Sequence, residues 1–156
     1  MSYDALLASD TVRPHGHTAG EVAQRLQEME QVARRHLADA EAQALSPDAK
    51  HNLAYAAGRV AAEMVLVAEG YRAGRGMGKH AAVFVFLGEA AGGRWSAEAA
   101  YFDQRRQRRN VSEYEQSGTI SPTEAGTVAR EAWRLLGEVA AWLEEQGPEA
   151  DREEDE

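Results

Sequence analysis

The chain has 156 residues, 44% of them hydrophobic, which is typical of one globular domain with a buried core. It contains no cysteine, which excludes disulfide bonds, Cys-ligated metals and thiol catalysis. The formal net charge of -9 disfavours broad nonspecific binding to nucleic acid. No apolar run approaches the roughly 20 residues that span a membrane, and no secretory signal is visible at the start. We therefore expect a cytoplasmic protein without membrane association.

Residues 1–17 show no apolar period and are predicted to form an N-terminal arm. Its His15-Gly16-His17 lacks the further ligands that a metal site needs, so no metal is predicted there. A helical bundle is expected over residues 18–147. Its first helix begins with a capping box, in which Thr18 caps the helix and Glu21 reaches back, and runs to about Ala44.

The second predicted helix opens at Ser46, a capping residue followed by proline. Apolar residues follow two of its faces, so it is expected to be the central helix of the bundle. His51 and Tyr55 lie one turn apart on a more polar side and are expected at a surface or an interface. The glycine-rich stretch 70–78 is predicted as a flexible loop. It lacks the Gly-Lys-Ser/Thr ending and the preceding strand of a nucleotide-binding loop.

Residues 80–87 include an apolar run that is locally typical of a buried strand. Because no second strand is apparent to pair with it, a short buried helix is predicted instead. After a glycine-rich break over 88–93, a helix begins at Ser96 and is expected to end at Gly118. The last helix opens with a second capping box at Ser121.

Gly147-Pro148 is expected to stop this last helix, which leaves an acidic, disordered tail over 148–156. Such a tail is flexible enough to fold back onto basic side chains elsewhere in the chain, or else serves only for solubility. The predicted fold is all-α, an up-and-down bundle of four long helices plus one short helix.

Residues 105–114 interrupt the amphipathic pattern of their helix. The apolar stripe of its first half continues onto Arg106, Arg109 and Glu113, which cannot pack in a core. The neighbouring stripe through Asn110 and Tyr114 is also polar, and it is placed like the seam of a homodimer. Arginine grips phosphate or carboxylate with a bidentate fork, while Asn and Tyr add hydrogen bonds. The other interpretation is a helix end that projects into solvent.

The stretch Arg109-Asn110-Val111-Ser112-Glu113-Tyr114 resembles the signature of the HEPN domains. That family shows Arg, a polar residue that is often Asn, three variable residues and then His. The wider order of motifs also resembles a bacterial HEPN subgroup, from about Val12 to Leu143. The stretches that carry this resemblance are Leu37-Ala38-Asp39-Ala40, Leu45-Ser46-Pro47-Asp48, Ala54-Tyr55-Ala56-Ala57, Glu69-Gly70-Tyr71-Arg72 and Gly78-Lys79-His80.

The resemblance implies a HEPN-like bundle that dimerises through its motif helices and needs no cofactor. Many such proteins are metal-independent ribonucleases in toxin–antitoxin or phage-defence systems. Arg109 would then hold the scissile phosphate and Asn110 would assist. Tyr114 stands where the family has His, and tyrosine, with a pKa near 10, is a poor general base at neutral pH. Either Tyr114 only hydrogen-bonds phosphate, or this member has lost cleavage. His80 is the candidate to substitute for the missing base.

Three functions remain open from the sequence. The first is an RNA-directed protein, either a weak ribonuclease or an RNA or nucleotide binder, in which Arg105, Arg106, Arg109 and His80 contact phosphate. The second is a non-catalytic, dimeric interaction module whose partner is a protein such as an antitoxin or a nucleotidyltransferase. The third is a bundle whose polar seam merely sets the register of a homodimer.

Overall fold

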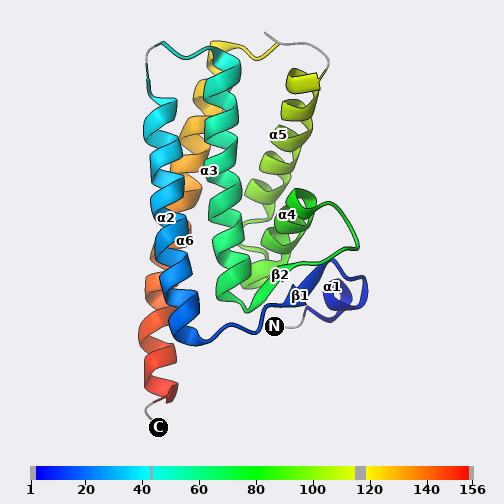
Figure 1. Cartoon of the computed structure of the whole chain (residues 1–156), viewed down its shortest axis with the longest axis vertical. Helices are drawn as coiled ribbons and strands as arrows, with labels where there is room; N and C mark the ends of the chain where they lie inside the picture. Colours follow the sequence, from blue (N-terminus) through cyan, green and yellow to red (C-terminus); the bar gives the residue numbers. More distant parts are fainter. Residues whose placement is uncertain (1–2, 43, 115–118, 155–156) are drawn as a thin grey trace.

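The computed structural model describes residues 3–42, 44–114 and 119–154, and the side chains of all of these except residues 109–114 and 147–154. The described chain is mostly helical, with a small two-stranded sheet (Figure 1). The all-α class predicted from the sequence is therefore confirmed. None of the described helices combines the length and the apolar character that crossing a bilayer requires.

Helices α2 (Ala19–Ala40) and α3 (Pro47–Ala68) begin at the capping residues that the sequence indicated. Thr18 and Glu21 form the complete capping box, and the Ser46 hydroxyl accepts the backbone N–H of Ala49. Helix α3 contacts α2, α4, α5 and α6, and most of its side chains are buried. This confirms that it is the central helix, as its two apolar faces predicted.

The apolar run after His80 forms a helix, α4 (Lys79–Glu89), as predicted. A short 3-10 turn, η1 (Ala90–Gly93), then leads into α5 (Ser96–Tyr114), which packs antiparallel to α4. Phe84 and Phe102 stack between these two helices with ring centroids 6.2 Å apart. The predicted end of this helix at Gly118 lies outside the described residues.

Helix α6 (Pro122–Glu154) is longer than the sequence predicted, because its backbone continues through Gly147 and Pro148. The expected stop and the irregular tail after it were therefore wrong for residues 148–154. At about 1.5 Å per residue, the acidic end lies roughly 45 Å along the helix from Glu124. Figure 1 shows that end projecting beyond the bundle, far from the C-terminal end of α5. The tail is thus not placed to cover the arginines of α5.

The N-terminal segment is part of the fold, a feature that the sequence did not reveal. It forms α1 (Asp4–Ala8) and β1 (Val12–Pro14), and β1 pairs antiparallel with β2 (Tyr71–Ala73) inside the glycine-rich stretch. Tyr3, Leu6 and Val12 are buried, and the Tyr3 ring packs 4.6 Å from that of Phe86. Residues 3–17 are consequently a covering layer at one end of the bundle.

The glycines of this stretch permit close backbone contact and do not form a phosphate loop. The N–H of Gly74 donates to Thr11 and that of Gly76 donates to Asp10, at 2.9 and 2.8 Å. A β-carbon at either glycine would overlap the backbone of residues 9–10. Asp10 also forms a two-point ion pair with Arg13 and accepts the N–H of Arg75. The expected flexible loop is therefore held at several points.

Candidate functional site

One carboxylate oxygen holds two of the α5 arginines. Oε2 of Glu124 accepts Nη1 of Arg105 at 2.8 Å and Nε of Arg108 at 3.0 Å. Arg108 also donates through Nη2 to the carbonyl oxygen of Thr119 at 2.6 Å. Because Glu124 is the third residue of α6, these bonds fix the C-terminal half of α5 against the start of the last helix.

The second capping box is only half formed, because Glu124 serves the arginines. Its backbone N–H donates to the Ser121 hydroxyl at 3.0 Å, as the sequence predicted. In a complete capping box its carboxylate would accept the backbone N–H of Ser121, but here the carboxylate binds Arg105 and Arg108 instead. The hydrogen bond from Arg108 is the main reason that the pKa of Glu124 lies below its ordinary value. Glu124 therefore stays ionised beside these cations.

Arg106 is bound on the neighbouring side of the helix. Its Nε donates to Asp103 at 2.9 Å, and Gln107 donates to the same carboxylate at 3.4 Å. The three described arginines thus meet two carboxylates, which leaves one positive charge over. A guanidinium has five N–H donors, and these bonds use only one or two on each arginine. Nε of Arg105 is buried without a partner among the described residues, so the donors open to another acceptor are on the partly exposed Arg106 and Arg108 and the outer nitrogens of Arg105.

The register of α4 on α5 places His80 level with Arg106. A β-carbon on Gly88 would lie 3.5 Å from that of Ala99, and Phe84 stacks on Phe102. The two helices are antiparallel, so one turn beyond the Phe84–Phe102 pair lies four residues earlier on α4 and four residues later on α5. That step pairs position 80 with position 106. The sequence could not show whether His80 approaches the arginine segment, and the register now supports that it does.

Beneath the arginines lies a buried histidine that the sequence analysis assigned to a surface or interface. His51 on α3 is 0% exposed, and neither ring nitrogen has a hydrogen-bond partner among the described residues. Burial lowers its pKa, and the positive charge of Arg105 lowers it further. The side chain of Asn52 opposes this shift, although its geometry falls short of a hydrogen bond. His51 is therefore neutral at pH 7.

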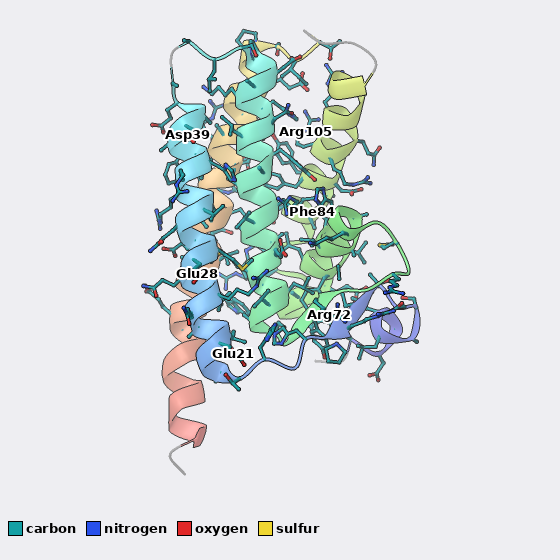
Figure 2. The ribbon with its side chains drawn as sticks, in the orientation of Figure 1. Glu21, Glu28, Asp39, Arg72, Phe84 and Arg105 are labelled. Carbon is teal, nitrogen blue, oxygen red and sulfur yellow. The ribbon has the colours of Figure 1, made fainter. Side chains whose placement is uncertain are left out.

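Tyr55, one turn after His51, is also buried, which corrects its expected surface position. Its ring packs 6.1 Å from Phe84. On the outer side, the guanidinium of Arg105 lies 5.5 Å from the centroid of the Tyr101 ring, within cation–π range. Figure 2 shows Arg105 between α3 and α5, so this arginine links the buried aromatic cluster to the surface.

The family-like motif itself falls at the end of α5. Arg109 and Asn110 occupy the helical turn that follows Arg105 and Arg106, and Tyr114 is the last helical residue. The side chains of all three lie outside the described residues. The described neighbours nevertheless show that the motif continues a helix whose preceding turn is anchored by ion pairs.

Comparison of the chain with family models, curated proteins and solved structures finds no match. Within the residues that the structure describes, no group of three His, Asp or Glu side chains is arranged to hold a metal ion.

Sequence reasoning missed two members of this site, His51 and Glu124. The helical period did not distinguish a buried polar position from an exposed one on α3. Glu124 was assigned to a local capping box, the usual role of Glu three residues after a helix cap. A usable signal was present, because the four arginines over 105–109 need counter-charges and Glu124 begins the next helix.

Proposed function

We propose that this chain is a HEPN-like, RNA-directed protein that contacts the RNA backbone through α5. The carrying observation is that ion pairs with Glu124 and Asp103 hold Arg105, Arg106 and Arg108 in place while part of each guanidinium side chain stays exposed. Fixing a guanidinium in advance reduces the side-chain entropy lost when it binds phosphate. Arg109 would extend the same basic surface by one turn.

Binding, and not rapid cleavage, is the activity that these residues favour. Tyr114 is a poor general base at neutral pH. His51 is neutral, but it is fully buried behind Arg105 and is closed to a substrate. His80 is the remaining imidazole near the cluster. A role in a toxin–antitoxin or phage-defence system follows only from the family resemblance and stands as part of this proposal.

RNA binding can be tested by fluorescence anisotropy with a labelled single-stranded RNA at several salt concentrations. We expect the double variant Arg106→Ala with Arg109→Ala to weaken binding and to reduce the salt slope by roughly 0.7 per lost phosphate contact. The matched control is Arg34→Ala with Arg35→Ala, which removes two arginines from the exposed side of α2. Equal losses in both double variants, or none in the first, would contradict the proposal.

The alternative function is a non-catalytic, dimeric module that binds a protein partner. One observation favours it, namely that each described arginine of the cluster already meets a carboxylate. A carboxylate on a second copy or another protein would use the same donors. Light scattering on the purified chain tests the homodimer directly. A monomer at tens of micromolar would remove the dimeric form of this alternative.

A further inference from the structure

A cavity of about 380 Å³ lies at the end of the bundle where β1 pairs with β2. Its walls come from the segment after β1, from β2, and from parts of α2, α3 and α4. Figure 2 shows Arg72 of β2 at the same end of the molecule as Glu21, which begins α2. Its volume is within the usual range for small-ligand sites, about 300–1,000 Å³.

Three cationic side chains line this cavity: Arg25, Arg72 and Lys79. None of them forms an ion pair with another described residue, whereas Arg105, Arg106 and Arg108 on α5 all do. The one carboxylate in the lining, Glu63, is bound to Arg59 at 3.3 Å. Within the described part of this acidic protein, three cations without an ion-pair partner thus surround one cavity, and such a charge attracts anions.

Two histidines form another wall. The imidazole of His15 donates through Nε2 to the carbonyl of Val67 at 2.9 Å, and its Nδ1 accepts the N–H of His17 at 3.0 Å. These partners assign its single proton to Nε2. The two rings lie 4.7 Å apart and are tilted by 32°. With both nitrogens engaged, His15 offers a fixed aromatic surface and no metal-binding lone pair.

We infer that this cavity binds a phosphate-bearing small molecule of about mononucleotide size. Arg25, Arg72 and Lys79 would hold the phosphate, since guanidinium and ammonium groups are the strongest side-chain donors to it. The His15–His17 wall and the half-buried Tyr71 ring would meet the flat, apolar part of the ligand. The same chemistry is presented by a free mononucleotide and by the phosphorylated end of an RNA.

This site is separate from α5 and does not depend on the function proposed above. Its walls are built by the arm and the glycine-rich stretch, which pair through β1 and β2. Lys79 begins α4 and lines the cavity, while the next residue, His80, is level with Arg106. The first residue of α4, Lys79, therefore belongs to the cavity, and the second, His80, belongs to the α5 site.

Isothermal titration calorimetry with AMP, adenosine and inorganic phosphate tests this inference on the full chain. We expect AMP to bind saturably and at least tenfold more tightly than adenosine, with phosphate competing. Arg72→Gln and Arg25→Gln should each weaken AMP binding about tenfold or more, as expected for the loss of a hydrogen bond to a charged group. Arg75→Gln is the matched control, since Arg75 is a nearby loop arginine that does not line the cavity.

Absence of saturable AMP binding, equal affinity for adenosine, or an equal loss in Arg75→Gln would overturn the inference. A short RNA with and without a 5′-phosphate distinguishes the two sources of ligand. A preference for the phosphorylated RNA over AMP assigns the site to RNA ends, and the reverse assigns it to free nucleotides. The Arg106→Ala, Arg109→Ala variant should keep its AMP affinity, so this test and the α5 test can fail separately.

Discussion

The ring of Phe102 on α5 lies directly against the backbone of Gly58 on α3. A β-carbon at position 58 would overlap the ring, which is itself buried and stacked on Phe84. This contact sets how closely the arginine helix approaches the central helix. It also explains a glycine in the middle of a helix, where that residue is otherwise unfavourable.

Replacing Gly58 with alanine should therefore destabilise the protein. We expect the free energy of unfolding to fall by about 1–3 kcal/mol, because the methyl group must displace a packed aromatic ring. Gly137→Ala on α6 is the control, since nothing lies within 4 Å of a β-carbon there. That change should be neutral or stabilising by up to about 1 kcal/mol. Urea unfolding measures the free energy of unfolding of both variants. If Gly58→Ala is as stable as the wild type, α5 can move away from α3 without cost.

Neutralising Glu124 should loosen the arginine segment. We expect Glu124→Gln to lose about 0.5–1.5 kcal/mol of stability at pH 7, because two charge-assisted hydrogen bonds are weakened. The pKa of Glu124 is lowered in the folded state, so its contribution is complete above its ordinary value of 4.5. The contribution is lost as pH falls through the lower folded-state pKa. The wild type and the variant should thus converge in acid, and a constant difference down to about pH 2 would contradict this.

The buried His51 should make stability depend on pH near neutrality. Its pKa is lowered in the folded state from the ordinary 6.5, so the unfolded chain binds a proton first as pH falls. Stability should consequently decrease below about pH 6.5, by at most ~1.4 kcal/mol per pH unit. Unfolding curves at pH 7, 6 and 5 should show a shallower dependence for His51→Leu. If both proteins give the same slope, another group is responsible.

Restoring the histidine of the family-like motif should reveal any latent ribonuclease. On the proposed function, Tyr114→His should raise RNA cleavage by on the order of 100-fold, the low end of general-base contributions. Tyr114→Phe is the control, because it removes the hydroxyl without supplying a base. Cleavage of a labelled RNA is followed on gels while binding is checked by anisotropy. Unchanged cleavage with intact binding would mean that this position is not catalytic.

Local signals in the sequence predicted the starts of the helices well. Thr18, Ser46 and Ser121 each cap a helix, because a capping side chain acts within one turn of its own position. The short helix α4 was also predicted correctly, from the lack of a partner strand. The identity of the central helix followed from its two apolar faces.

Long-range relationships were not predictable from the same patterns. Strands β1 and β2 have three residues each, too few to show an alternating pattern, and Pro14 lies 57 positions before its partner Tyr71 in the sequence. The burial of His51 depends on α5 and α6 covering it. Glu124 had a sufficient local role, so its pairing with Arg105 and Arg108 could be found only in three dimensions.

The pairing of β1 with β2 affects any fragment that starts at Thr18, the boundary that the sequence suggests. Such a fragment would lose Tyr3, Leu6 and Val12 and would uncover Phe86. It would also leave β2 as an open strand edge, and open edges recruit other chains. We expect the shortened protein to self-associate on heating, so an aggregate formed by that fragment would carry no information about the native oligomer.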